Sequence, residues 1–351
     1  LNMNKYIHKY IRNLKMKKLL LASTAIVATA GMAAADITMS GYAEIGMRDA
    51  GGAVGMEMHS DMDIGFKLSG ASDNGLTFGA SIDLDEVSGG IASTGGPHAV
   101  HVSGAFGTLT MGDTDGALDK ANAEVAALTT IADDHSTHAG YNGGAGLDSG
   151  DILRYDTTYG GFGLSASIGQ SDVAVANDVM GYGVTTSIGS VAVSAAYQAD
   201  NTQDITAVSA KTTIGGLTMT ANYSEATMAA TASGAVITPA TYSIATGSIA
   251  GSAAVTTSAA INNSYEHSAI GLAYTVSGVN LHANYGNYDF DNGTNADGYG
   301  LAANYGLGGG ATVMVGYGNG TAQGATADVT TFSVGLGRSE ERRVGKECRS
   351  R

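Results

Sequence analysis

The chain of 351 residues has no tryptophan, two prolines and one cysteine. Because Cys348 stands alone near the end of the chain, the sequence offers no disulfide framework and no cluster of thiolates for metal or redox chemistry. Beyond residue 35, no uninterrupted apolar run reaches the roughly 20 residues that a membrane-spanning helix needs. These absences argue against a disulfide-rich secreted domain and against a helical membrane protein.

Basic side chains are also scarce through most of the chain. Residues 36–337 carry 29 acids but only five bases, and the remaining Lys and Arg residues lie in the first 18 and the last 14 positions. The five bases of this body are Arg48, Lys67, Lys120, Arg154 and Lys211. A body this acidic repels nucleic acid and attracts cations.

Glycine, in contrast, is abundant. The chain has 52 glycines and a mean hydropathy of +0.05. This composition is typical of β-structure and not of helices or disorder. A membrane β-barrel has such a near-neutral average because its lipid-facing and lumen-facing side chains alternate.

Residues 16–35 have the three parts of a secretory signal peptide. Two lysines form the basic end, an apolar core follows, and three alanines provide the cleavage site. The core is too short for a membrane anchor, so we expect cleavage to leave Asp36 as the first mature residue. Residues 1–15 precede a natural start at Met16 and are interpreted as an upstream extension that is not native.

Short alternating segments recur from Asp36 onward. In residues 60–71, for example, the even positions are mainly apolar and the odd positions mainly charged or polar. A period of two with one apolar face indicates a β-strand. Several later apolar rows end in tyrosine, as an interfacial aromatic girdle requires. Strands are predicted at 36–48, 60–71, 74–85, 97–105, 107–112, 150–160, 161–170, 178–189, 190–199, 203–214, 216–225, 264–276, 278–288, 296–306, 310–318 and 325–337.

The connections between these sixteen strands alternate between short and long. The short ones are tight turns, and the long ones lie at 49–59, 86–96, 113–149, 171–177, 200–202, 226–263, 289–295 and 319–324. An even antiparallel barrel with both chain ends on the turn side requires this sorting, whereas a soluble sandwich does not. The predicted fold class is therefore all-β: a transmembrane antiparallel β-barrel of about sixteen strands.

The third long connection, residues 113–149, carries seven acids and two histidines and shows no strand alternation. Long connections of this kind are uncommon in compact proteins and are usually functional. We expect this third loop to fold into the lumen of the barrel and to narrow it.

Four stretches together resemble the alphaproteobacterial branch of the general bacterial porins. They are MKKLLLASTAIVATAGMAAADITMSGYAEIGM, SDMDIGFKLSGASDNGLTFGASIDLDE, SGAFGTLTMGDTDGALD and GGAGLDSGDILRYDTTYGGFGLSAS. The resemblance spans residues 16–337, and FGTLTMGDTDGA at the start of the third loop is its most specific part. It implies a water-filled, homotrimeric channel of sixteen strands in the outer membrane, reached by signal-peptide export. The implied partners are outer-membrane lipid and lipopolysaccharide, the barrel-assembly machinery, and the ions and small hydrophilic solutes that pass through.

Residues 338–351 depart from the family pattern, in which the last strand ends in an aromatic residue, usually Phe. This segment, RSEERRVGKECRSR, has six bases in fourteen residues and resembles a translated cloning or sequencing adapter joined to a truncated reading frame. We therefore interpret residues 36–337 as the barrel and exclude the tail from it as an artefact.

In the porin family, acids of the third loop face a basic cluster on the barrel wall, and solutes pass between them. The wall candidates are the bases Arg48, Lys67 and Arg154. Arg48 shares a strand face with Glu44. Because an unpaired charge facing lipid is costly, each should point to water, either in the lumen or at the barrel rim. The predicted constriction residues are Arg48, Lys67, Arg154, Glu44, Asp113, Asp115, Asp119, Glu124, Asp133 and Asp134.

Two acidic stretches contain ligand types of a metal site, transition-metal in the first and Ca²⁺ in the second. They are Asp133-Asp134-His135-x-x-His138, and Asp289-x-Asp291 with Asp297. Neither matches an EF-hand, and a solvated polar loop is the simpler explanation. We expect no cofactor, with Ca²⁺ at the acidic loops as the alternative. The sequence also lacks the G-x-S-x-G elbow of a hydrolase, so we expect no enzymatic activity.

The predicted function is passive diffusion of ions and small hydrophilic solutes. The third loop sets the size limit, and the acidic lining sets a preference for cations. Two alternatives stay open at this point. One is a substrate-selective channel on the same barrel, and the other is a plugged barrel that acts as a structural or adhesive surface protein through loops 86–96 and 226–263.

Overall fold

The structure is a computed structural model of the chain. It describes residues 36–51, 55–85, 98–125, 130–131, 152–170, 178–200, 202–228, 241–243, 248–250 and 264–344. At residues 85, 241–243, 248–250 and 341–344 only the backbone is described. The expected signal peptide and the extension before it lie outside the described residues.

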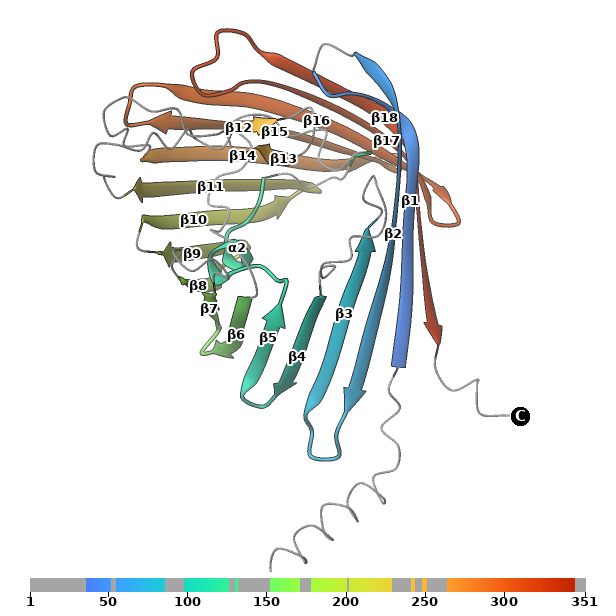
Figure 1. Cartoon of the computed structure of the whole chain (residues 1–351), viewed down its shortest axis with the longest axis vertical. Coiled ribbons are helices and arrows are strands. Elements are labelled where there is room, and N and C mark those ends of the chain that lie inside the picture. The colour runs from blue at the N-terminus through green and yellow to red at the C-terminus, as the bar shows by residue number, and fades with distance from the viewer. Residues whose placement is uncertain are drawn as a thin grey trace, which may run out of the picture.

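Sixteen strands form one closed antiparallel barrel (Figure 1). They are β1 (Asp36–Asp49), β2 (Met56–Ala71), β3 (Thr77–Asp85), β4 (His98–Gly104), β5 (Gly107–Gly112), β6 (Ile152–Tyr159), β7 (Phe162–Gly169), β8 (Val179–Ile188), β9 (Val191–Ala199), β10 (Gln203–Ile214), β11 (Leu217–Met228), β14 (Tyr265–Val276), β15 (Val279–Phe290), β16 (Asn295–Gly308), β17 (Ala311–Thr321) and β18 (Val329–Val344). Barrel neighbours follow the chain order, and the ring closes where β1 pairs with β18. Because a closed ring has no sheet edge, the wall can pair its backbone donors and acceptors.

A short helix and a short hairpin are not part of the barrel wall. Helix α2 (Ala117–Ala121) follows β5, and the hairpin of β12 (Thr241–Ser243) and β13 (Ser248–Ala250) lies between β11 and β14. The sequence analysis missed α2, β12 and β13, because elements of three to five residues are too short to show a period. Among the described residues, no helix has the length and apolar character needed to cross a membrane.

Tight turns join the strands at one end of the barrel. At Gly160-Gly161 and Gly215-Gly216 both residues have positive φ angles, which glycine adopts without the steric cost that other residues meet. Turns of this kind match the right-handed twist of the flanking strands. The other end of the barrel carries the longer connections, as the sequence predicted.

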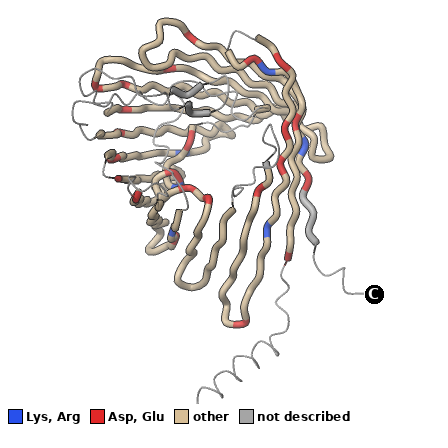
Figure 2. The backbone as a smooth tube through the Cα atoms, viewed as in Figure 1, with Lys and Arg blue, Asp and Glu red and all other residues tan. Residues whose placement is uncertain are grey.

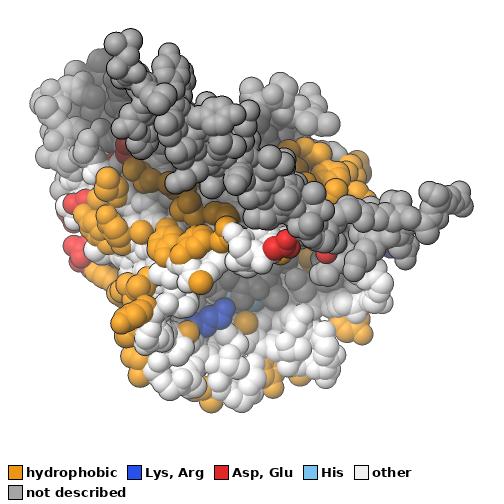
Figure 3. Space-filling model, turned by 90° about the horizontal axis from the view of Figure 1, so that it is seen from below, with side chains coloured by type: hydrophobic (Ala, Val, Ile, Leu, Met, Phe, Trp, Pro, Cys, Tyr) orange, Lys and Arg blue, Asp and Glu red, His pale blue; other side chains and the backbone are white. Residues whose placement is uncertain are grey.

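Side chains alternate between an inner and an outer face along the wall. On β1, Ile45 is 62 % exposed on the outer face, whereas its neighbour Glu44 is 2 % exposed on the inner face. Hydrophobic side chains gather over the outer surface (Figure 3). Acidic residues recur around the barrel, and bases are few (Figure 2). An apolar outer face is what contact with lipid requires.

All sixteen predicted strands are present, and most of their boundaries agree within a few residues. The predicted loop 49–59 is shorter, because β2 begins at Met56 and pairs with β1 as far as Asp49. The predicted loop 319–324 is displaced to residues 322–328, because β17 continues to Thr321. In both places, backbone pairing extends a strand into sequence that looks like a loop.

The largest difference concerns the last strand, which was predicted to end at 337. Instead, β18 runs to Val344, and residues 338–344 pair with residues 37–43 of β1. The physical reason is that the first half of β1 would otherwise leave unpaired N–H and C=O groups in the membrane, at several kcal/mol each. The first part of the basic tail therefore belongs to the wall.

Two charges of this extension stand on the outer face. The side chains of Arg338 and Glu340 are 61 % and 56 % exposed and form an ion pair with each other. Arg338 pairs with Ala43 of β1, and Glu340 pairs with Gly41. These positions lie on the same outer face as Ile45 and other apolar side chains. Charges at these positions interrupt the apolar outer face near the turn between β16 and β17.

We predict that replacing the tail improves assembly. In the test chain, residues 338–351 are replaced by seven residues. This new segment is apolar at positions 338 and 340 and ends in Phe. This strand keeps the pairing with β1 and removes the two outward charges, each of which costs about 0–1 kcal/mol near the interface and more toward the midplane. The measurement is the yield of heat-modifiable barrel in outer-membrane fractions. Deletion of residues 345–351 alone is the control, and equal yields from the parent and the replaced chain would contradict the prediction.

Candidate functional site

The described residues of the third loop, 113–125, 130 and 131, lie against the inner face of the barrel, and we call them the wall-lining segment. As the residue numbers rise, the segment contacts β6–β11, then β14 and β15, and finally β17, β18 and β1 (Figure 1). Its described residues therefore follow the wall around much of the barrel. Residues 126–129 and 132–149 of the predicted loop lie outside the described residues.

A small apolar cluster inside the barrel holds helix α2. Leu118, which has no exposed surface, and Ala121 belong to this cluster. Their partners on the inner faces of β9, β10, β11 and β14 are Ala196, Ile205, Ala207, Ala226 and Tyr265. Burying one leucine side chain contributes about 1.5–3 kcal/mol. The cluster explains why the inner face of the barrel is apolar at these positions.

Polar side chains of the wall bind the backbone of the segment on both sides of the helix. Ser167 Oγ accepts a hydrogen bond from Ala117 N at 2.8 Å, and Ser209 Oγ accepts one from Ala123 N at 2.9 Å. Asn222 Nδ2 donates to the Ala123 carbonyl at 3.1 Å. These bonds fix where the backbone enters and leaves α2.

The segment stays close to the wall beyond the helix. The Nε2 atom of His282 lies 2.7 Å from the Val125 carbonyl oxygen, and it must carry the hydrogen because a carbonyl only accepts. Further on, the buried side chains of Thr130 and Ile131 reach inner-face positions that have no side chain of their own. These positions are Gly316 for Thr130, and Gly46 and Gly335 for Ile131.

Arg154 of β6 ties the start of the loop to the wall. Its Nε donates to Asp156 Oδ2 at 2.9 Å, and its Nη1 donates to Thr114 Oγ1 at 3.0 Å and to the Asp115 carbonyl. Asp156 also accepts a hydrogen bond from Ser165 at 2.6 Å. Arg154 is only 6 % exposed. The predicted wall base thus lies on the inner face, but its guanidinium is engaged in holding the loop.

The inner face of β1 and β2 carries an ion pair and a contact between a carboxylate and a histidine. Arg48 Nε lies 3.9 Å from Glu57 Oε1, and both side chains are partly exposed. Buried Glu44 accepts a hydrogen bond from the Tyr42 hydroxyl at 2.7 Å and lies 2.7 Å from His59 Nε2. Arg48 and Glu44 share this face, as the strand pattern predicted.

Lys67 lines a polar pocket of about 280 Å³ at the start of the third loop. Asp113 of the loop lines the same pocket, together with Ser81 and Asp83 of β3. A predicted loop acid and a predicted wall base are therefore neighbours here. Lys67 is exposed, and none of the ion pairs between described residues includes it.

A larger polar pocket of about 610 Å³ extends along the inner faces of β4–β8. Lys120 of α2 and Arg154 line it, with His101 and a set of Ser and Thr side chains. Such a surface can hydrogen-bond water and polar solutes. Ser103, on the same face of β4 as His101, hydrogen-bonds the Thr77 hydroxyl at 2.5 Å.

The remaining predicted residues divide into two groups. Asp119 in α2 and Glu124 after it belong to the wall-lining segment. Asp133 and Asp134 lie outside the described residues, as do His135 and His138. Several titratable side chains of the inner face were not predicted as site residues: Glu57, His59, Asp61, Asp63, Asp83, Asp156 and Lys211. Their alternation with apolar neighbours on the same strands was the signal that could have found them.

The described part of the chain contains no group of three or more His, Cys, Asp or Glu residues that could hold a metal ion. In the stretch considered for Ca²⁺, Asp289 accepts a hydrogen bond from Asn287 Nδ2 at 2.9 Å. The backbone N–H of Asp291 donates to the Ser264 carbonyl at 3.0 Å. These contacts support the loop end of β15.

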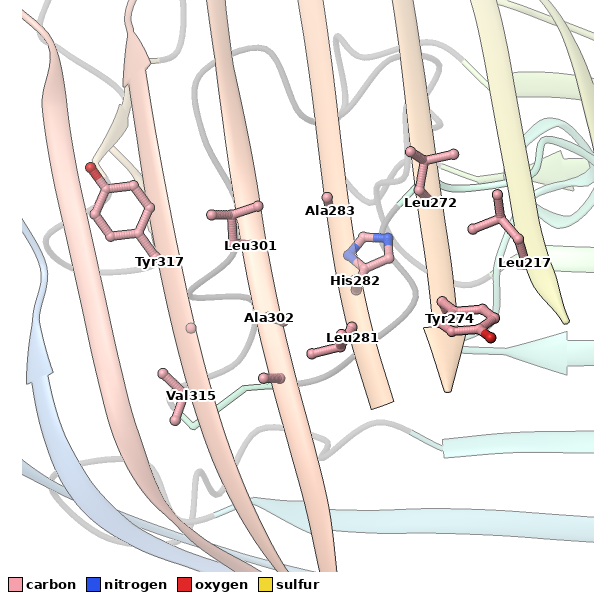
Figure 4. A pocket seen from close by; sticks show the side chains of 12 residues that line it. Leu217, Leu272, Tyr274, Leu281, His282, Ala283, Leu301, Ala302, Val315 and Tyr317 are labelled. Atoms are coloured by element: carbon pink, nitrogen blue, oxygen red, sulfur yellow. The ribbon is translucent and has the colours of Figure 1, made fainter. Parts of the chain in front are cut away.

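An apolar pocket of about 550 Å³ lies on the outer face of β11 and β14–β17 (Figure 4). Its lining includes Leu272, Leu281, Leu301, Val315 and Tyr317. It opens away from the lumen and belongs to the membrane-facing surface. The polar side chains line the inner wall and not this pocket.

Comparison with known proteins places this geometry in context. Residues 22–336 match the sequence model of a family described as Gram-negative porin. A porin of Rhodobacter capsulatus is 28 % identical over 262 residues, which cover 72 % of this chain and 84 % of that protein. The structure is also similar to a porin refined at 1.8 Å resolution, with a TM-score of 0.66 at 20 % identity, and to a triple mutant of Rhodopseudomonas blastica porin, with a TM-score of 0.59 at 17 % identity. Both alignments cover 87 % of this chain and 100 % of the other, and they show a shared fold.

Replacing the two inner-wall arginines should have unequal effects on stability. Arg154→Met removes charged hydrogen bonds worth about 1.5–3 kcal/mol each, whereas Arg48→Met removes a half-exposed pair worth about 0.2–1 kcal/mol. We expect the temperature at which the folded, heat-modifiable band disappears to fall clearly for Arg154→Met and little for Arg48→Met. Equal shifts would show that Arg154 does not anchor the loop.

Proposed function

The chain belongs to the Gram-negative porin family and is a β-barrel channel of the outer membrane, not an enzyme. From this premise we propose that its lumen passes ions and small hydrophilic solutes by passive diffusion and prefers cations. We further propose that the third loop sets the size limit.

The position of the wall-lining segment carries this proposal. The segment covers a mostly uncharged part of the inner wall, from β7 to β17, while the charged inner faces of β2 and β3 border the remaining space. Solutes would pass between the two. The residues proposed for this constriction are Asp113, Asp115, Asp119, Glu124, Asp133 and Asp134 on the loop, and Arg48, Lys67, Arg154 and Glu44 on the wall.

Charge pairing on the inner face supports the preference for cations. The two arginines whose side chains the structure describes on the inner wall are already paired with acids, Arg48 with Glu57 and Arg154 with Asp156. Asp61 and Asp83 are further acids on this face, and the loop adds more. Acids in a water-filled lumen lower the barrier for cations, and salt screens the effect.

The two alternatives make different predictions about transport. A substrate-selective channel would pass one solute much faster than others of equal size, which a flux assay on reconstituted vesicles would reveal. A plugged structural or adhesive barrel would pass no ions, so single-channel conductance would exclude or establish it. Diffusion predicts measurable conductance and graded exclusion by solute size.

We also propose that three copies assemble, with β18 and β1–β5 at the subunit contact. Outward tyrosines occur from Tyr155 on β6 to Tyr317 on β17, and the described outer faces of β1–β5 and β18 have none. Methionines are common there instead, among them Met58 at 88 % exposure. Because tyrosine girdles mark a lipid–water interface, a face without them suits contact with another subunit. Lipopolysaccharide, the assembly machinery and Ca²⁺ at the acidic loops stay proposals that rest on the family resemblance and the acid content.

Neutralising inner-wall acids should weaken selectivity. In planar bilayers with a KCl gradient, we expect the parent channel to give a zero-current potential that favours potassium, most strongly in dilute salt. Asp61→Asn with Asp83→Asn should reduce that potential. Glu225→Gln with Glu266→Gln is the matched control, because these two exposed acids face outward. A parent channel that favours chloride would overturn the proposed preference.

Cross-linking should locate the subunit contact. In a Cys348→Ser background, Met58→Cys should yield cross-linked species larger than a monomer with a short bifunctional thiol reagent. Leu301→Cys, on the tyrosine-bearing side and 46 % exposed in the parent, should stay monomeric. Only monomer from both variants, with folded barrel present, would count against a trimer with this contact.

A further inference from the structure

Two glycines of the inner wall lie directly beneath the backbone of the wall-lining segment. A Cβ atom built on Gly183 of β8 would stand 2.5 Å from the Ala117 carbonyl oxygen and 2.7 Å from Ala121 Cβ. A Cβ atom on Gly271 of β14 would stand 2.9 Å from the carbonyl carbon of Val125, with the carbonyl oxygen closer still. Ordinary contacts of a Cβ atom begin at 3.4 Å. The loop therefore occupies the space that a side chain would fill.

The backbone of the wall does not require glycine at either position. Neither residue has a positive φ, and the pairing of β8 and β14 with their neighbours is regular around them. A glycine inside a strand weakens it, so a reason outside the strand is needed. The approach of the loop supplies one.

Each glycine has a polar neighbour that binds the same part of the loop. On the strand beside Gly183, Ser167 of β7, which pairs with Gly181, accepts the hydrogen bond from Ala117 N at 2.8 Å. On the strand beside Gly271, His282 of β15, which pairs with Ala273, donates from its ring to Val125 O at 2.7 Å. The wall thus combines a missing side chain, which lets the backbone approach, with a side chain that holds it there.

Contacts elsewhere along the segment differ in kind. At Gly316 and Gly335 an added Cβ would meet side-chain atoms of Thr130 and Ile131, and also atoms of the wall itself. Flexible side-chain ends can move away, whereas a backbone carbonyl moves only with its chain. Gly183 and Gly271 are therefore the positions where the wall fixes the depth of the loop backbone.

We propose that Gly183 and Gly271 are positioning residues that set how far the third loop projects into the lumen, and so set the open cross-section of the channel. This inference rests on the proposed diffusion function. The strands are held by hydrogen bonds on both sides, so an added methyl group displaces the loop and not the wall. The displacement is directed away from the wall, toward the solute path.

Conductance of the full chain, with Cys348→Ser, tests this inference in planar bilayers. Gly183→Ala and Gly271→Ala should each lower single-channel conductance, and the double variant should lower it further. Gly306→Ala is the matched control. It lies on the inner face of β16 with no atom within 4 Å of the added Cβ, and it should conduct like the parent.

A second measurement reports the loop position without ion flow. Val125, 2 % exposed in the structure, is changed to Cys in each background, and its modification by a water-soluble maleimide is followed. The thiol should react faster with Gly271→Ala than with Gly306→Ala. For Gly183→Ala, the probe is Leu118→Cys, which replaces a side chain with no exposure.

Unchanged conductance together with unchanged thiol reactivity in folded Gly183→Ala and Gly271→Ala barrels would overturn the inference. If one variant fails to assemble, the other decides. A parent barrel that assembles but passes no ions would refute the proposed diffusion function instead. In that case the maleimide rates alone would still establish or refute the role of the two glycines.

Discussion

The structure depends on one constraint: no backbone donor or acceptor in the wall can be left unpaired in hydrocarbon, where no water can satisfy it. The ring of sixteen strands meets this constraint only because β18 continues to Val344 beside β1. Closure also fixes the register, and a slip of one residue would turn every outward apolar side chain into the lumen. The chemistry of the lumen and the apolar outer surface are therefore set by the same pairing.

The inner wall has two regions with different physical character. Where the wall-lining segment lies, the inner face behaves like a protein core, with Leu118 and Ile205 packed together and glycines under the backbone. On β2 and β3, which the segment approaches only through Asp113, the inner face carries charges such as Asp61 and Lys67. Without a loop inside the barrel, these apolar inner side chains would have nothing to pack against. The sequence of the wall is thus matched to the loop as well as to lipid.

The strands could be predicted because a period of two and glycine turns are local signals that survive in every hairpin. The extension of β18 could not be predicted, because its charged composition is not typical of a membrane strand. Its reason is the first half of β1, which needs a pairing partner. The place of Arg154 on the inner face followed from alternation with Asp156. The hydrogen bonds from its guanidinium to Thr114 and Asp115 could not be predicted, because Thr114 lies 40 residues away in the sequence. The glycine contacts are equally non-local, and no window of sequence contains them.

The wall-lining segment has a mechanical consequence. A barrel wall is one strand thick, and each strand is bonded only to its two neighbours, so nothing in the wall itself resists flattening. The segment links strands that never pair, from Ser167 on β7 to Gly46 on β1, and so acts as an internal brace. Under lateral pressure from the bilayer, the braced side should keep its curvature and the charged side of β2 and β3 should yield first. The shape of the pore is then stiff on one side and compliant on the side that carries the charge.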